Sequence, residues 1–241
     1  MRFATTFFAL PLIASASFAA PCDHVKGVGN VEKKSLTVQS FHGISMEGSM
    51  DVVLTQGPTQ GVIIEAQANI AALVTTEVRN GVWIISTEKS YSTDKDFVVR
   101  ITAPVIDIVH LDGSGDVTSE GVFDVSKMDL AIAGSGNITL AFNATITQAD
   151  IEGSGDMKLS GSSKKVRIQV AGSGDVNAKE LRSNEAAADI SGSGDVTLYA
   201  AESLEASIDG SGDINFLGRP GRVNTNVNGS GEVRQVGIGP R

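Results

Sequence analysis

One pentapeptide constrains this chain more than any other feature, because close copies of Gly-Ser-Gly-Asp-Val recur along its second half. Seven copies begin at Gly113, Gly134, Gly153, Gly172, Gly192, Gly210 and Gly229. Successive copies start 18 to 21 residues apart. A short, regular period of this kind is typical of repeat architectures, in which each unit buries its apolar face against the next.

Apolar residues occupy fixed positions on both sides of each copy. Two residues before its first glycine stand Leu111, Ile132, Ile151, Val170, Ile190, Ile208 and Val227. Four residues after that glycine stand Val117, Ile138, Met157, Val176, Val196, Ile214 and Val233. Alternate residues of a strand share one face, so both columns are predicted to point inward. A unit of about 19 residues is too short for a helix plus strands but suffices for one coil. The pattern therefore predicts an all-β fold, a parallel β-helix of ~19-residue coils.

Glycine is expected at each corner because the backbone there must adopt a positive φ or pass close to the neighbouring coil. A degenerate copy, Gly48-Ser49-Met50-Asp51-Val52, precedes the array and carries Met in place of the second glycine. A second corner is predicted halfway round each coil, at segments such as 161–163, 183–184 and 218–221.

The chain divides into five predicted segments. Residues 1–20 are expected to be a secretory signal peptide, with Arg2 before an apolar run and small residues at Ser17 and Ala19. A loose leader (21–34) and an N-terminal strand-rich portion (35–103) precede the repeat β-helix (104–236) and a C-terminal tail (237–241). Within 35–103, Asn80-Gly81 predicts a hairpin, and residues 69–76 are compatible with a short helix.

Composition narrows the classes of partner. The formal net charge is −9, which disfavours nucleic acid and anionic membranes. The apolar run of the signal is too short for a stable anchor, so no transmembrane anchor is expected after its removal. Cys22 is the sole cysteine, which excludes an intramolecular disulfide. Its position suggests a lipoprotein, but Pro21 stands where lipidation motifs prefer small residues, which favours a free thiol.

The acidic residue of each corner is the most suggestive chemical feature. This Asp column comprises Asp116, Asn137, Asp156, Asp175, Asp195, Asp213 and Glu232. Asp and Asn cap tight turns with their own side chains, which explains the residue type without a ligand. The alternative is a ladder of carboxylates that binds calcium, with Asp156, Asp175, Asp195 and Asp213 as candidate metal ligands. No other cofactor is predicted.

Catalytic motifs are weak. A nucleophilic serine needs a positioned base, and His24, His42 and His110 are too few and scattered to supply one to each corner. A β-helix enzyme acting on polysaccharides would need carboxylates in a cleft built by long loops, whereas every unit here has 18 to 21 residues. No catalytic residue is therefore predicted, and such an envelope enzyme is kept as the alternative function.

The Gly-Ser-Gly-Asp-Val/Ile units, preceded by segments 41–56 and 62–85, resemble the bacterial GIN-domain family, labelled "putative auto-transporter adhesin head". The resemblance covers roughly residues 38–233. It implies an exported, right-handed parallel β-helix protein, periplasmic or at the surface of a bacterial cell.

The expected function is that of a non-enzymatic cell-envelope protein with a structural or adhesin-like role. Its partner would be a glycan or another envelope protein. The predicted surface combines the Asp column with its outward neighbours Thr118, Thr139, Lys158, Asn177, Thr197 and Asn215. At the far end of the array, either Arg234, Pro240 and Arg241 blunt the open strand edge or that edge supports dimerisation.

Overall fold

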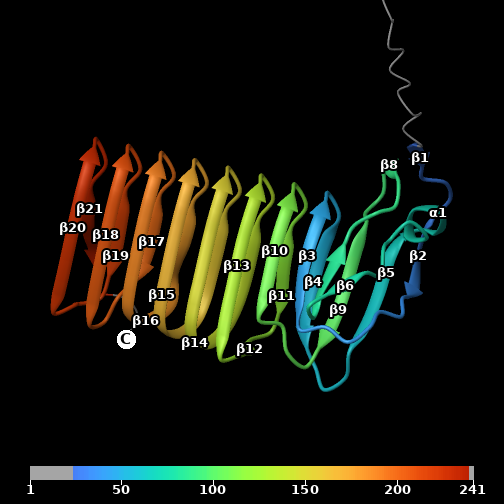
Figure 1. Cartoon of the computed structure of the whole chain (residues 1–241), viewed down its shortest axis with the longest axis horizontal. Coiled ribbons are helices and arrows are strands. Elements are labelled where there is room, and N and C mark those ends of the chain that lie inside the picture. The colour runs from blue at the N-terminus through green and yellow to red at the C-terminus, as the bar shows by residue number, and fades with distance from the viewer. Residues whose placement is uncertain (1–23, 239–241) are drawn as a thin grey trace, which may run out of the picture.

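The computed structural model describes residues 24–238, so the predicted signal peptide, Cys22 and the last three residues lie outside the described part. The chain forms an elongated β-solenoid whose coils stack side by side along its length (Figure 1). The predicted parallel β-helix is confirmed. Almost all regular structure is strand, and the single described helix has four residues.

Strands that end at the Gly-Ser-Gly corner form one wall, here called sheet 1. These strands are β3 (Gly43–Gly48), β10 (Ile108–Gly113), β13 (Lys127–Gly134), the later halves of β14 (Ile138–Gly153), β15 (Met157–Gly172) and β16 (Val176–Gly192), then β18 (Ser203–Gly210) and β20 (Arg222–Gly229). They pair in parallel with corner glycine on corner glycine, as in Gly134 with Gly153. The degenerate copy follows the same register, because Gly48 pairs with Gly113.

Strands that begin after the corner form the opposite wall, sheet 2. These are β4 (Asp51–Gln56), β11 (Val117–Glu120), the short β12 (Phe123–Asp124), the earlier halves of β14, β15 and β16, then β17 (Val196–Tyr199), β19 (Ile214–Leu217) and β21 (Val233–Gly237). Their neighbours also pair in parallel. Unequal repeat lengths are absorbed away from the corner, for example by a register shift between Lys158 and Ser160.

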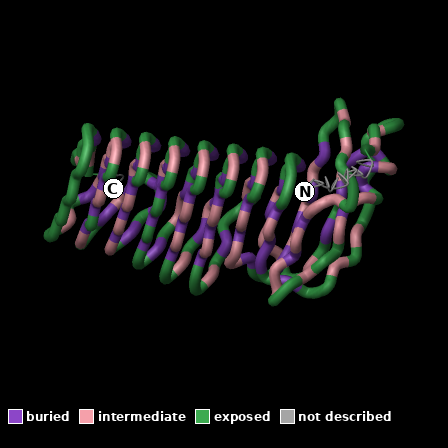
Figure 2. The backbone as a smooth tube through the Cα atoms, turned by 45° about the horizontal axis from the view of Figure 1, so that its top comes forward, coloured by how far each residue is buried: buried purple, intermediate pink, exposed green. Residues whose placement is uncertain are grey.

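The two predicted apolar columns form the core between the sheets. Leu111, Ile132 and Val117 are 0–1% exposed, and the columns stay buried as far as Ile208 and Ile214. Figure 2 shows this alternation of buried and exposed residues along the coils. The last coil differs, because Val227 is 43% exposed and no further described strand covers it.

Strands in mixed parallel and antiparallel pairing close the N-terminal end of the solenoid. The elements here are β1 (His24–Lys26), β2 (Val31–Ser35), β5 (Gly61–Gln67), α1 (Ala68–Ala71), β6 (Val78–Arg79), β7 (Val82–Ile85), β8 (Ser90–Ser92) and β9 (Val98–Ala103). On sheet 2, β9 pairs in parallel with β4, and β5 and β2 follow in antiparallel order. On sheet 1, β7 pairs with β3 and forms the predicted hairpin with β6, whose turn residues Asn80 and Gly81 have φ of 52° and 79°.

The structure differs from the sequence expectation in two places at this end. The predicted loose leader contains β1 and β2, and the helix is limited to Ala68–Ala71. Side chains distant in sequence order the leader: Gln67 Nε2 donates to Gly29 O (2.9 Å), and Asn69 Nδ2 donates to Lys26 O (2.8 Å). All of β2 is exposed, so its sequence carries no apolar alternation that would have predicted a strand.

Candidate functional site

The corner is built on two glycines that are required for different reasons. Gly172 has φ +135°, and a Cβ there would lie 2.2 Å from the carbonyl oxygen of Gly153 in the preceding coil. Gly174 has no positive φ, but its Cβ would lie 2.1 Å from Gly155 O. Met50 is tolerated at the second position because the adjacent layer, β7 to β9, has no such corner beneath it.

The Asp column is a hydrogen-bonded ladder between coils. In each step a side-chain Oδ1 accepts the backbone N–H of the acidic or amide residue one coil further on, at 2.8–3.1 Å. The ladder runs through Asp51, Asp116, Asn137, Asp156, Asp175, Asp195, Asp213 and the N–H of Glu232. The expected capping therefore acts on the backbone of the next coil rather than on the residue's own turn.

Asn137 shows which part of the side chain the ladder needs. Its Oδ1 accepts from the N–H of Asp156 at 3.1 Å, as a carboxylate would. Its Nδ2 also donates to Asp116 Oδ1 at 2.9 Å. Asp and Asn side chains have the same length and both carry an Oδ1 acceptor, so the hydrogen bond between coils does not require a charge.

No group of three or more His, Cys, Asp or Glu side chains within residues 24–238 converges closely enough to hold a metal ion. Asp156, Asp175, Asp195 and Asp213 each use one oxygen for the ladder. Calcium binding by these four aspartates stays a prediction.

A shallow groove of about 490 Å³ runs beside the middle of the Asp column. It is lined by Asp116, Asn137, Thr139, Asp156, Met157, Lys158, Asp175 and Asn177. The structure thus brings together the first four members of the predicted Asp column and three of its predicted outward neighbours, whereas Asp195, Asp213 and Glu232 lie beyond the groove. Thr118, Thr197 and Asn215 continue the outward column on β11, β17 and β19, beyond the groove.

The groove offers hydrogen-bonding groups that the fold does not use. Asp156 and Asp175 engage Oδ1 in the ladder, and within the described chain their Oδ2 atoms accept no hydrogen bond. Lys158 forms no ion pair there. Carboxylate oxygens of the Asp column repeat at about 4.8 Å from coil to coil. The ammonium group of Lys158 and the amides of Asn137 and Asn177 lie in the same groove.

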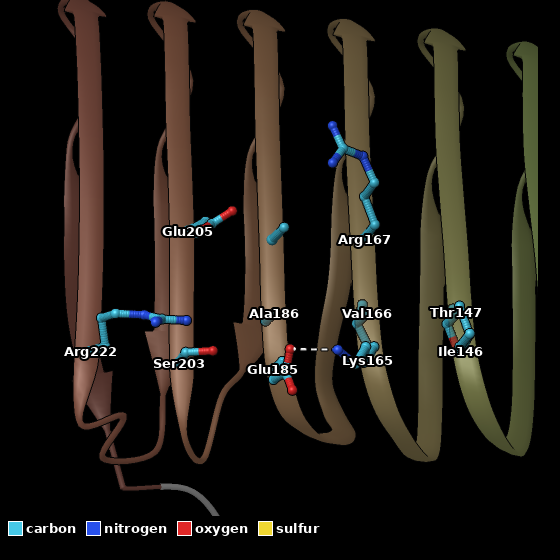
Figure 3. A pocket seen from close by; sticks show the side chains of 11 residues that line it. Ile146, Thr147, Lys165, Val166, Arg167, Glu185, Ala186, Ser203, Glu205 and Arg222 are labelled. Carbon is cyan, nitrogen blue, oxygen red and sulfur yellow. Dashed lines mark ion pairs between the residues drawn. The ribbon is translucent and has the colours of Figure 1, made fainter.

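A second depression, of about 300 Å³, lies on the outer face of sheet 1 (Figure 3). Its floor includes Ala186 and Ala187. Lys165 Nζ meets Glu185 Oε2 at 2.9 Å across neighbouring coils, and Arg222 points in from the last coil (Figure 3). Sequence analysis missed this surface, although Lys165 and Glu185 stand one repeat apart and could have been paired by that spacing.

Glu65 has the clearest electrostatic perturbation of a carboxylate. Lys33 Nζ and Arg100 Nε each lie 2.8 Å from Glu65 Oε1. Their hydrogen bonds, that of Lys33 first, hold the pKa of Glu65 below its ordinary value of 4.5 despite partial desolvation. The three residues come from β2, β5 and β9, so this cluster fastens the N-terminal closure rather than forming a reactive site.

The histidines occupy separate surface positions. His24 lies within 3.0 Å of Ser92 Oγ, His42 pairs with Asp107 at 2.7 Å, and His110 lies 3.7 Å from Asp129. None of these contacts includes a corner serine. They are surface interactions on three different strands or loops.

The family is decided by a match that spans most of the described fold. Residues 40–220 match the family described as "Putative auto-transporter adhesin, head GIN domain". The chain belongs to this family. The predicted resemblance is therefore confirmed. No curated protein matches the chain.

Solved structures of similar fold come from Bacteroides and Parabacteroides species. A Bacteroides fragilis protein described as a putative adhesin superposes with a TM-score of 0.81 at 24% identity, over 88% of this chain and 100% of that one. A Parabacteroides distasonis protein titled a putative lipid binding protein gives 0.73 at 23%, over 88% and 99%. A putative adhesin of Parabacteroides merdae gives 0.68 at 20%, over 89% and 99%. At these identities the likeness establishes the solenoid fold.

Within residues 24–238, the one helix is far too short to span a bilayer, and no membrane-crossing helix is found.

Proposed function

We propose that this GIN-domain protein is an exported, non-enzymatic adhesin-like protein of the cell envelope, which binds a polar glycan along the groove beside the Asp column. The observation that carries the proposal is the row of unused Oδ2 atoms at Asp156 and Asp175, flanked by Lys158. Sugar hydroxyls donate to such oxygens, and the rigid ladder holds them in place before the ligand arrives.

A binding role fits this site better than catalysis. Asp156 and Asp175 each use one carboxylate oxygen to accept a backbone N–H of the next coil, so these side chains already have a structural role. The groove is shallow and built from consecutive coils with no inserted loop to exclude water. A polysaccharide-active enzyme needs an enclosed pair of carboxylates in distinct environments.

The test is binding of the mature chain to immobilised neutral and acidic polysaccharides. In an Asp156→Asn, Asp175→Asn variant, both oxygen acceptors of the ladder persist but the free anionic oxygens are lost. We expect at least a tenfold loss of glycan affinity with an unchanged melting temperature. A Lys165→Ala, Arg167→Ala variant on sheet 1 is the matched control and should bind normally.

Unchanged affinity of the double Asn variant would contradict the assignment of this groove. Shortening of the polysaccharide during incubation would instead establish the enzymatic alternative. Product sizes should therefore be measured alongside binding.

A further inference from the structure

The last coil leaves a strand edge and part of the core uncovered. β20 pairs with β18 on one side, and no described strand lies on its other side. All eight of its residues are exposed. Val223 and Val227 continue inward columns whose members in β18, Leu204 and Ile208, are at most 1% exposed. At this end of the solenoid, β20 therefore leaves unpaired backbone groups and apolar side chains of the inward face exposed (Figures 1 and 2).

The opposite end of the solenoid is closed differently. Its outermost strand on sheet 2, β2, carries Lys33 and Lys34, and charged lysines on an edge oppose strand addition. On sheet 1, β6 is a strand of two residues. The contrast argues against head-to-tail stacking of copies. It leaves the last coil, in which β20 and β21 each pair on one side only among the described strands, as the end able to accept a strand.

The backbone of β20 directs its free groups outward at odd-numbered positions. The N–H of Arg222 donates to Glu202 O in the preceding coil. Backbone groups alternate direction along a strand, so those of Val223, Thr225 and Val227 face the open side. These three residues also carry the side chains of the inward face.

The sequence of this strand is a palindrome, Val223-Asn224-Thr225-Asn226-Val227. Antiparallel pairing centred on Thr225 would set Val223 against the partner's Val227, Asn224 against the partner's Asn226, and Thr225 against the partner's Thr225. Directly opposed residues share a face, so all four valines would lie on the core side. The outward-facing backbone groups would form the hydrogen-bonded pairs of this register.

Charge does not oppose such pairing. In this register Arg222 faces the partner's Asn228, and the two Arg222 side chains stand six residues apart. That is about 20 Å along the strand, beyond the Debye length of roughly 8 Å at physiological salt. The nearby Arg234 is neutralised within its own chain by Asp213, at 2.5 Å.

We propose that two copies of this chain join end to end through β20, in an isologous antiparallel pair centred on Thr225. Sheet 1 then continues from one copy into the other, and the exposed valines of both last coils become covered. The arrangement closes after two copies, because each contributes its one open end. It also places two copies of the groove on one rigid rod, which would raise avidity for a repeating polymer.

Sedimentation velocity of the mature chain over a range of concentrations tests this. We expect a dimer mass for the natural sequence. Thr225→Lys places like charges directly opposite and should weaken dimerisation at least about tenfold. Asn224→Lys adds the same charge opposite the partner's Asn226 and should leave the dimer intact.

A mixing experiment makes the register falsifiable even if one variant folds poorly. Thr225→Lys and Thr225→Glu chains should each be monomeric alone and form a 1:1 dimer when mixed, since Lys then faces Glu. A natural chain that stays monomeric at all concentrations would overturn the proposal. A dimer equally stable in the Thr225→Lys variant would overturn it as well, because the contact would then lie elsewhere.

Discussion

The Oδ1 atom of Asp175 accepts the backbone N–H of Asp195, one full coil further along the chain, at 2.8 Å. The N–H of Asp175 in turn donates to Asp156 Oδ1 at 2.9 Å. A repeated acidic residue thus acts as a connector between coils, and its replacement can be predicted from Asn137. Asp175→Asn should keep the melting temperature within a degree or two, whereas Asp175→Ala should cost about 1 kcal/mol by leaving an N–H unpaired. Equal melting of the two variants would contradict the connector role.

The corner glycines allow conformation and steric clash to be separated. Gly121→Ala meets a positive φ of 96° in open space and should cost about 1–2 kcal/mol. Gly174→Ala has no positive φ, but its Cβ would lie 2.1 Å from a carbonyl oxygen of the neighbouring coil. Gly172→Ala combines a positive φ with such a clash. Each of these two variants should lose upwards of about 3 kcal/mol of folding stability. Gly61→Ala, with neither obstacle, is the control. Thermal melting of the four variants measures the order, and a neutral Gly174→Ala would refute the clash.

The stability of the N-terminal closure at low pH should depend on Glu65. Its pKa is lowered in the folded chain by Lys33 and Arg100, so its contribution to stability is present above pH 4.5 and is lost as pH falls through the folded pKa. Glu65→Gln should therefore be less stable than the natural chain at pH 7, with the difference shrinking below about pH 4. Melting curves at pH 7, 5 and 3 provide the measurement. A stability difference between the two chains that grows as the pH falls would contradict this prediction.

Calcium distinguishes the two interpretations of the Asp column. If Asp156, Asp175, Asp195 and Asp213 only connect coils, calcium and sodium at matched ionic strength should raise the melting temperature equally, by screening repulsion of roughly 1 kcal/mol per neighbouring pair. We expect this outcome, since one oxygen of each side chain is already engaged. A calcium-specific rise that disappears in an Asp175→Asn, Asp195→Asn variant would instead establish chelation.

The sequence by itself determined the repeating part of the fold. A period near 19 residues, two apolar columns and the Gly-Ser-Gly corner are local features, and each recurs often enough to exclude other architectures. Even the degenerate copy at Gly48 could be aligned with the array, and the structure pairs it with Gly113. The Asn80-Gly81 hairpin was equally readable, because a two-residue turn specifies its own geometry.

Only the tertiary structure decided the ends and the use of the polar side chains. The strands of the leader exist because Gln67 and Asn69 bind backbone more than 35 residues away, which no local pattern encodes. From Asp116 onward, the backbone N–H that donates to each ladder side chain lies 18 to 21 residues further along the chain, so turn chemistry alone suggested the wrong backbone group. Burial of Val227 likewise depends on whether another strand covers it. Hydrogen bonds between coils, and the burial of side chains by a neighbouring coil, depend on how the coils stack. The local sequence of one coil specifies the strands and corners of that coil.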